Sequence, residues 1–159
     1  MYNTLDCPQC GASVKEYTNP APTVDVVVYT PEHGVLLIER KNIPLGHALP
    51  GGFVDCGESA EHAAVRELKE ETNLDVTLDG LLGVYSKPNR DPRQHTLGVV
   101  FAGTASNPDA LCAGDDAAAA AYYPLDNLPP TLAFDHAEIL KDFEEVLRGE
   151  RTLVPIQNP

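Results

Sequence analysis

The chain has 159 residues, 43% of them apolar and 22% charged, which fits one globular domain around a single hydrophobic core and excludes a disordered or fibrous protein. Acidic residues number 24 against 11 basic ones, and the formal net charge of −13 argues against binding to nucleic acid or to an acidic membrane. No apolar run is long enough to span a bilayer, and the first residues lack the pattern of a secretion signal. The four scattered cysteines predict no disulfide framework, so a reducing cytoplasm is the expected compartment.

The first 22 residues predict an N-terminal arm, and residues 23–159 the domain itself. The arm carries a Cys-Pro-Gln-Cys-Gly motif at residues 7–11 and ends in a proline-containing stretch at residues 19–22. Cys7 and Cys10 supply two metal ligands, whereas a closed zinc site takes four. The chain contains no second Cys-x-x-Cys. Two subunits therefore share a zinc ion, or the motif is a vestige.

Two β-branched runs follow the arm. Residues 23–29 (TVDVVVY) predict a strand, and residues 35–40 (VLLIER) predict its hairpin partner. The intervening residues 31–34 (PEHG) have the composition of a turn. Arg40 closes the second strand and is a candidate phosphate contact, the alternative being an exposed strand terminus.

Next comes a helix that begins at Ser59 and continues past Glu71 without glycine or proline. Glu67, Glu70 and Glu71 stand at i, i+3 and i+4, so their carboxylates share one face of the helix. Like charges at that spacing destabilise a helix by about 0.2–0.5 kcal/mol per pair. A hard divalent cation would offset this repulsion, and Mg²⁺ fits because it takes carboxylate oxygens and is usually shared with substrate phosphates.

The alternative for the three glutamates is a solvated acidic helix face. That reading leaves the surrounding residues unexplained. Gly51-Gly52 allows close approach of the backbone to metal or phosphate, and Arg66 stands four residues before Glu70, within reach of its carboxylate. The metal site is therefore the preferred interpretation.

Residues 52–74 read GFVDCGESAEHAAVRELKEETNL and resemble the Nudix box, Gly-x5-Glu-x7-Arg-Glu-hydrophobic-x-Glu-Glu-x-Gly-hydrophobic. The residues that match the box are Gly52, Glu58, Arg66, Glu67, Leu68, Glu70, Glu71 and Leu74. Asn73 alone departs, standing where glycine is usual. Asparagine is the next-best residue for a left-handed helix cap, so the departure is mild.

The resemblance implies a Nudix hydrolase with the α/β (α+β) Nudix fold, a mixed β-sheet in an α/β/α sandwich. The metal-binding set that it implies for Mg²⁺, or alternatively Mn²⁺, consists of Gly52, Glu67, Glu70 and Glu71. The catalytic set that it implies consists of Glu70, Glu71, Glu67, Arg66 and Glu58, with Arg66 orienting a glutamate. In the chemistry of the family, the metal neutralises a diphosphate and activates a water, and a carboxylate accepts the proton.

Beyond the box, residues 81–86, 96–105 and 117–123 predict three more strands. Residues 134–148 predict an amphipathic helix, which Gly149 stops. Strands alternating with two helices predict a mixed sheet packed between helices in one domain.

A polar connection at residues 87–94 concentrates positive charge in an otherwise acidic protein. The run at residues 85–96 (YSKPNRDPRQHT) resembles the same segment of ADP-ribose pyrophosphatase-like Nudix proteins, a likeness that extends from about residue 20 to 147. Arginine forks suit phosphate oxygens. The expected substrate-binding residues are Arg40, Arg90, Arg93 and His95. The alternative for each is a solvated charge, with Arg90 paired to Asp91.

The expected reaction is hydrolysis of ADP-ribose to AMP and ribose 5-phosphate. A nucleoside triphosphate pyrophosphohydrolase is a second enzyme hypothesis. A non-catalytic domain that senses ADP-ribose is a third hypothesis, although such sensors usually carry a DNA-binding domain and a degraded box, and this sequence shows neither.

One departure concerns the general base. Relatives of this type commonly read Gly-Asp-Asp-Ala-Ala-Glu before the last strand, and Ala119 stands here in place of that glutamate. A supplementary base must then come from Asp115, Asp116 or the box itself.

The motif at residues 7–11 resembles one zinc knuckle, similar to the zinc ribbon that precedes some Nudix domains that cleave NADH. A homodimer is expected, because proteins resembling ADP-ribose pyrophosphatases often pair and the arm could cross to a partner; the alternative is a floppy terminus. Cys56 and Cys112 are expected to be buried or incidental thiols.

Overall fold

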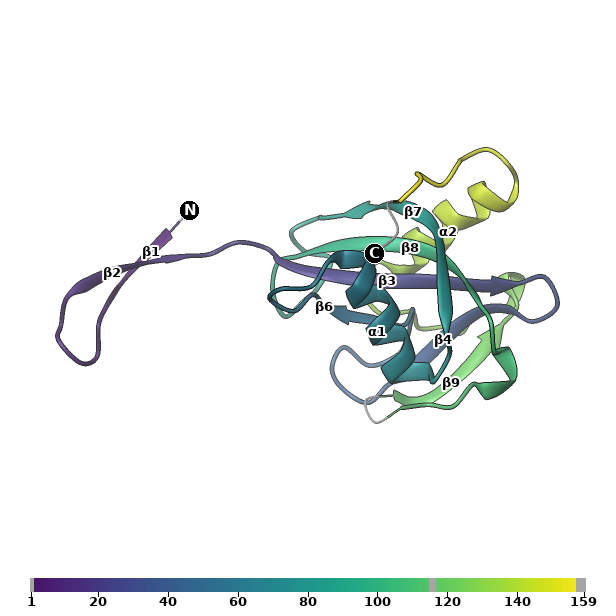
Figure 1. The fold of residues 1–159 in the computed structure, drawn as a ribbon, viewed down its shortest axis with the longest axis horizontal. Helices are drawn as coiled ribbons and strands as arrows, with labels where there is room; N and C mark the ends of the chain where they lie inside the picture. Colours follow the sequence, from purple (N-terminus) through teal and green to yellow (C-terminus); the bar gives the residue numbers. More distant parts are fainter. Residues whose placement is uncertain (1, 115–116, 157–159) are drawn as a thin grey trace.

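A computed structural model of the chain describes residues 2–114 and 117–156 (Figure 1). The strands are β1 (Tyr2–Asp6), β2 (Ser13–Tyr17), β3 (Ala21–Thr30), β4 (Gly34–Arg40), β5 (His47–Ala48), β6 (Gly51–Phe53), β7 (Val76–Tyr85), β8 (Thr96–Ala105) and β9 (Ala117–Tyr123). The α-helices are α1 (Ala60–Thr72) and α2 (His136–Leu147), and short 3₁₀ turns span Pro108–Ala110 and Leu125–Asn127. None of the helices in the described residues is long and apolar enough to cross a membrane.

The main sheet is mixed, as predicted. Its strands lie in the order β5-β4-β3-β8-β7, with β6 pairing to β3 and β9 to β4. Strand β3 runs parallel to β8 and antiparallel to its other partners. The predicted hairpin of β3 and β4 is confirmed, but its register holds only Tyr29↔Val35 and Thr30↔Gly34, and β4 then pairs with β9. This divergence leaves the edge of β3 free for β6, which brings Gly51 opposite Asp25.

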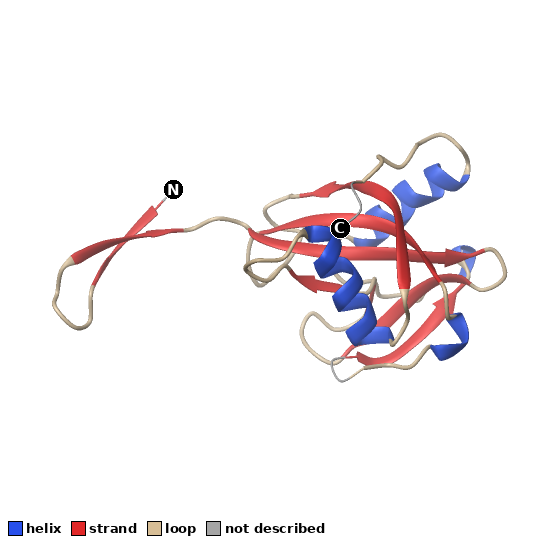
Figure 2. Cartoon of the chain, in the orientation of Figure 1, coloured by secondary structure: helices blue, strands red, loops and turns tan. Residues whose placement is uncertain are grey.

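The sheet carries one helix on each face (Figure 2). Side chains alternate between the two faces of a strand, and β3 follows this period. Val24, Val26 and Val28 pack in the cluster of α1, whereas Val27 packs in the cluster of α2. The first cluster includes Ala63, Ala64 and Leu68 of α1, and the second includes Ile139, Leu140 and Phe143 of α2. The predicted sandwich is confirmed.

The ends of α1 match their sequence signals. The Ser59 side chain accepts a hydrogen bond from the His62 backbone N–H at 3.1 Å, as an N-cap does. Asn73 takes a left-handed conformation with φ of 58°, and its N–H donates to the Lys69 carbonyl at 2.9 Å. Asparagine therefore performs the capping that glycine performs in the usual box.

Strand β7 and helix α2 begin at other residues than predicted. Strand β7 begins at Val76 rather than residue 81, because register shifts near Gly80 and Gly83 accommodate glycines that weaken the strand signal. Helix α2 begins at His136 rather than residue 134, because Phe134 has φ of 57°, outside the helical region.

The N-terminal arm forms a hairpin of its own. Strands β1 and β2 pair antiparallel from Tyr2↔Tyr17 to Asp6↔Ser13, a pairing that the sequence did not predict. The hairpin extends away from the body of the domain (Figure 1). Because β3 already begins at Ala21, the main sheet starts two residues before the expected boundary.

Candidate active site

The glycines of β6 lie directly against the glutamates of α1. The Gly51 N–H donates to Glu71 Oε2 at 2.8 Å. A Cβ atom at Gly52 would overlap the Glu67 carboxylate, and one at Gly51 would overlap the β3 backbone. Only glycine therefore allows this strand to fit between β3 and the glutamates.

Arg66 is the centre of an ion-pair cluster on the same side of α1. Its Nη2 and Nε atoms donate to the two Glu58 carboxylate oxygens at 2.5 and 3.1 Å. Its Nη1 atom donates to Glu67 at 2.8 Å and to Glu70 at 3.3 Å. Hydrogen bonds from Arg66, joined by the Asp55 N–H, lower the pKa of Glu58 to about 2. Glu58 therefore stays ionised and anchors the arginine.

Burial raises the pKa of two of the three helix glutamates, Glu67 and Glu71. Desolvation raises the pKa of Glu71 to about 8, against the opposing hydrogen bond from Gly51. Desolvation also raises the pKa of Glu67, although Arg66 counteracts it. Two carboxylates that are costly to ionise side by side would be stabilised by a nearby cation.

These carboxylates supply hard oxygen donors, which fit Mg²⁺ or Mn²⁺. Among residues 2–114 and 117–156, no three His, Cys, Asp or Glu side chains form a group that could hold an ion as they stand. Glu67 contacts Arg66, Glu71 accepts from Gly51, and the Glu70 side chain is 59% exposed. Binding a cation would therefore exchange these contacts for coordination.

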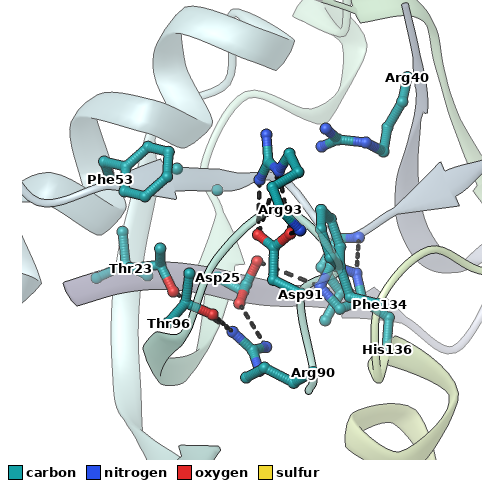
Figure 3. Close-up of a pocket in the computed structure, with 14 residues that line it drawn as sticks. Thr23, Asp25, Arg40, Phe53, Arg90, Asp91, Arg93, Thr96, Phe134 and His136 are labelled. Carbon is teal, nitrogen blue, oxygen red and sulfur yellow. Dashed lines mark hydrogen bonds and ion pairs between the residues drawn. The ribbon is translucent and has the colours of Figure 1, made fainter. Parts of the chain in front are cut away.

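An open cavity of about 310 Å³ adjoins the glutamates. Its lining brings acidic and basic groups together and includes Arg40, Asp55, Glu67, Glu71 and Arg93. A second, smaller cavity shares the glycines of β6, Phe53 and both arginines, and continues over β3 to His136 (Figure 3).

Two guanidinium groups meet at one aromatic ring in this region. The Arg40 guanidinium carbon lies 4.7 Å from the centroid of the Phe134 ring, and that of Arg93 lies 5.5 Å from it. Arg93 also lies 5.9 Å from the Phe53 ring, so it stands between the two phenylalanines (Figure 3). Burial, together with the charge of Arg93, lowers the pKa of Arg40. Like charges held this close favour an anion beside them.

Each of these arginines also has a protein partner. Arg40 Nε donates to the Pro44 carbonyl at 2.7 Å. Arg93 pairs with the buried Asp91, with Nη2 2.8 Å from Oδ2, while its own side chain is 41% exposed. Both guanidinium groups therefore have fixed positions at the cavity.

Of the other two expected substrate contacts, Arg90 lines the smaller cavity but is buried in its wall, and His95 lies outside both cavities. The Arg90 side chain is only 4% exposed and donates to both oxygens of Asp135, at 2.9 and 2.7 Å. Burial would lower the pKa of Arg90, but Asp135 and Asp25 raise it. His95 is exposed, with Nε2 3.1 Å from the Ser86 carbonyl oxygen, and it lines neither cavity.

Two further residues of this region, His136 and Phe134, had no predicted role. His136 is buried; its Nδ1 accepts from the Leu49 N–H at 2.8 Å, and its Nε2 lies 3.4 Å from Asp25. Phe134 takes the left-handed conformation in the loop before α2, and its ring reaches both arginines. A non-glycine residue with positive φ often marks a functional site, but the conformation is not visible in the sequence.

The candidate bases Asp115 and Asp116 lie outside the described residues. The preceding Gly114 abuts the end of α1, where its N–H donates to the Glu71 carbonyl at 2.9 Å. Ala119, at the position of the usual glutamate, is exposed on β9 opposite Glu39. The remaining candidates for the base are the box glutamates and the acidic residues Asp115 and Asp116.

The cysteines outside the arm take no part in this site. Cys56 lies in the loop before α1 and Cys112 in the loop before β9. Both side chains are exposed free thiols. The alternative that they are buried is therefore wrong, and the alternative that they are incidental remains.

Comparisons with known proteins agree on one family. Residues 19–143 match the profile of the NUDIX domain. The ADP-ribose pyrophosphatase of Methanocaldococcus jannaschii is 50% identical over 129 residues, covering 80% of this chain and 75% of that protein. A putative 8-oxo-dGTP diphosphatase of Bacillus subtilis is 36% identical over 119 residues, covering 75% and 76%. The NUDIX domain of Shewanella oneidensis NrtR, solved with ADP ribose, superposes with a TM-score of 0.69 at 29% identity, covering 82% and 90%.

Proposed function

Because this chain belongs to the Nudix hydrolase family, we propose that it hydrolyses ADP-ribose to AMP and ribose 5-phosphate. The observation that carries the proposal is one cavity lined by Glu67 and Glu71 together with Arg40 and Arg93. A diphosphate needs both a cation, which the glutamates would hold, and fixed positive groups on its outer oxygens. The 50% identity to an ADP-ribose pyrophosphatase supports the choice of substrate.

The proposal places Mg²⁺, or Mn²⁺ in its stead, among Glu67, Glu70, Glu71 and the Gly52 backbone. A divalent cation bound there would neutralise the diphosphate and make water a better nucleophile. Arg66, held by Glu58, fixes the position of Glu67. A box glutamate accepts the proton of the attacking water in this proposal, because Glu67 and Glu71 line the cavity beside the cation.

Arg40 and Arg93 bind the phosphate groups in this proposal. The rings of Phe53 and Phe134, which already pack against Arg93, offer planar surfaces on which a base or ribose can lie. Arg90 has a structural role in this proposal, because it lies in the wall of the smaller cavity and holds Asp135. His95 has no role in substrate binding here, because it lines neither cavity.

The charge of the protein favours a diphosphate over a triphosphate. The net charge is −13, and two arginines line the larger cavity along with Lys41. A triphosphate brings more negative charge than these groups can meet. The similarity to a putative 8-oxo-dGTP diphosphatase nevertheless makes nucleoside triphosphate hydrolysis a second candidate function.

A substrate panel with Mg²⁺ tests the choice. ADP-ribose is expected to give the highest kcat/KM, with AMP and ribose 5-phosphate as products. Release of pyrophosphate from dGTP or 8-oxo-dGTP at a tenfold higher kcat/KM, about 1.4 kcal/mol in transition-state stabilisation, would replace the first candidate by the second. ADP-ribose binding without turnover would instead support the sensing function.

The proposal includes a homodimer, because the arm projects from the body and forms a two-stranded sheet separate from the main sheet (Figure 1). It also includes a reducing cytoplasm, which suits four free thiols. Light scattering at micromolar concentration is expected to give twice the chain mass of 17.1 kDa.

A further inference from the structure

The turn of the N-terminal hairpin has a defined geometry. The Cys7 N–H donates to the Ala12 carbonyl at 2.9 Å, and the Gly11 N–H donates to the Cys7 carbonyl at 2.8 Å. Gly11 has φ of 70°, which closes the turn at little cost for glycine. The turn therefore places Cys7 and Cys10 together at one end of the hairpin.

Such a pair is half of a tetrahedral thiolate site. Zinc in structural sites takes four ligands, and a Cys-x-x-Cys turn supplies two. Within the part of the chain that the structure describes, no third Cys, His, Asp or Glu joins this pair. Cys56 and Cys112 belong to loops of the body, from which the hairpin extends away (Figure 1). The remaining two ligands must therefore come from another molecule.

Among the described residues, the hairpin forms a two-stranded sheet of its own, separate from the main sheet. Each strand has five residues, and an isolated two-stranded hairpin is marginally stable in water. Leu5 and Val14 stand opposite each other in the register and are 47% and 46% exposed. These side chains would gain stability by contact with a second apolar pair.

A second copy of this hairpin fits these requirements. Residues 1–18 contain two acids, Asp6 and Glu16, and one base, Lys15, so the arm carries −1 of the net charge of −13. Two arms can thus approach with little repulsion, whereas two bodies repel each other strongly. A two-fold axis places identical groups from both copies around one point.

We propose that two chains join through their N-terminal arms, and that Cys7 and Cys10 of both copies together bind one structural zinc ion. The site gives the homodimer a physical cause and is independent of the hydrolytic function. Each cysteine thiol releases its proton to solvent when it binds the zinc ion as a thiolate, and metal binding stabilises the paired hairpins. The apolar pairs of Leu5 and Val14 pack beside the ion.

Elemental analysis and light scattering on the same sample test the proposal. The full-length protein, purified under reducing conditions with zinc present, is expected to hold about one zinc per two chains and to be a dimer. Cys7→Ser and Cys10→Ser should each lose the zinc and give monomers. Cys56→Ser and Cys112→Ser are matched controls, since they also replace exposed thiols, and both should keep zinc and dimer.

Other outcomes overturn the proposal. These are a zinc-free dimer, a monomer with one zinc per chain, a disulfide between Cys7 and Cys10 under reducing conditions, or a dimer that survives both arm variants. Folding of the variants is checked by their hydrolytic activity per chain, which should remain because the residues of the candidate active site lie in one chain. Failure of the zinc site would thus be distinguishable from failure of the proposed reaction.

Discussion

Two arginines in this fold each hold a carboxylate through paired hydrogen bonds, but in different surroundings. Arg66 holds Glu58 beside the larger cavity, and its side chain is 24% exposed. Arg90 holds Asp135 beneath the smaller cavity, and its side chain is 4% exposed. The two ion-pair clusters share the same pairing geometry but differ in exposure. We call Arg66 with its glutamate partners the open cluster, and Arg90 with Asp135 and Asp25 the buried cluster.

This difference decides what each cluster can do. Arg66 also contacts Glu67, which lines the cavity, so a ligand can reach the cluster and alter its contacts. Arg90 is enclosed by Asp135, Asp25 and two threonines, and removing one partner there leaves a buried charge without compensation. We therefore expect damage to the open cluster to reduce activity and damage to the buried cluster to reduce stability.

The largest expected effect is a loss of turnover when a glutamate of the candidate metal site, in or beside the open cluster, is replaced. Glu70→Gln and Glu71→Gln should each lower kcat by roughly three orders of magnitude, because losing a metal ligand removes several kcal/mol of transition-state stabilisation. Steady-state kinetics with ADP-ribose and Mg²⁺ measures this. Glu61→Gln on the same helix is the matched control. Near-normal turnover in both Glu70 and Glu71 variants would refute the metal-site assignment.

The buried cluster should show the opposite response. Arg90→Met is expected to destabilise the protein by about 3–5 kcal/mol, because Asp135 and Asp25 lose their buried partner. Denaturant unfolding gives the value. Arg148→Met is the control, since Arg148 is 49% exposed and its loss should leave the free energy of unfolding nearly unchanged. Adding Asp135→Asn to Arg90→Met should recover part of the loss; no recovery would mean that the ion pair is not the cause.

A further test concerns Glu71, beside the open cluster, and measures how the free energy of unfolding depends on pH. In the metal-free protein, burial raises the pKa of Glu71 from 4.5 to about 8. A raised acid contributes fully to stability below its unfolded pKa, and this contribution is lost as pH rises through the folded pKa. The free energy of unfolding should therefore fall by about 2–4 kcal/mol between pH 4.5 and 8.

Glu71→Gln removes the ionising group, so its metal-free form should lose less stability over the same pH range. Denaturant unfolding of both proteins in chelator measures the difference. Equal slopes against pH in the two proteins would show that Glu71 ionises at its ordinary pKa.

The smallest expected effect concerns substrate contact. Arg93→Ala should lower kcat/KM for ADP-ribose by about tenfold, or 1.4 kcal/mol, and should change dGTP hydrolysis less. Lys87→Ala is the control in the same connection, because Lys87 is 65% exposed and lies at neither active-site cavity. An equal loss for both substrates would place Arg93 in the support of the fold rather than in substrate recognition.

Features that depend on neighbours in the chain could be predicted from the sequence. The strands Thr96–Ala105 and Ala117–Tyr123 have the predicted bounds, because β-branched and apolar runs between turn residues specify them locally. The caps of α1 were predictable for the same reason, since Ser59 and Asn73 act on backbone groups within four residues. The grouping of Glu67, Glu70 and Glu71 on one side also follows from helical spacing alone.

The partners of β3 could be predicted only in part. Its hairpin with β4 was visible in the sequence, but its parallel pairing with β8 joins Ala21 to Thr96, and its pairing with β6 joins Asp25 to Gly51. Contacts across such separations depend on how the helices cover the sheet, which local pattern does not encode. The placement of Asp25 beside His136 arises in the same way.

The sequence by itself determined the family, the mixed sheet and the helix that carries the three glutamates. Only the tertiary structure decided what the two arginines of one polar connection do. Arg90 and Arg93 stand three residues apart with similar local surroundings, yet Arg90 is buried against Asp135, 45 residues away, and Arg93 lies at the cavity between Phe53 and Phe134. The free energy of burying a charge depends on partners brought by the whole fold, so no local signal separates the two residues.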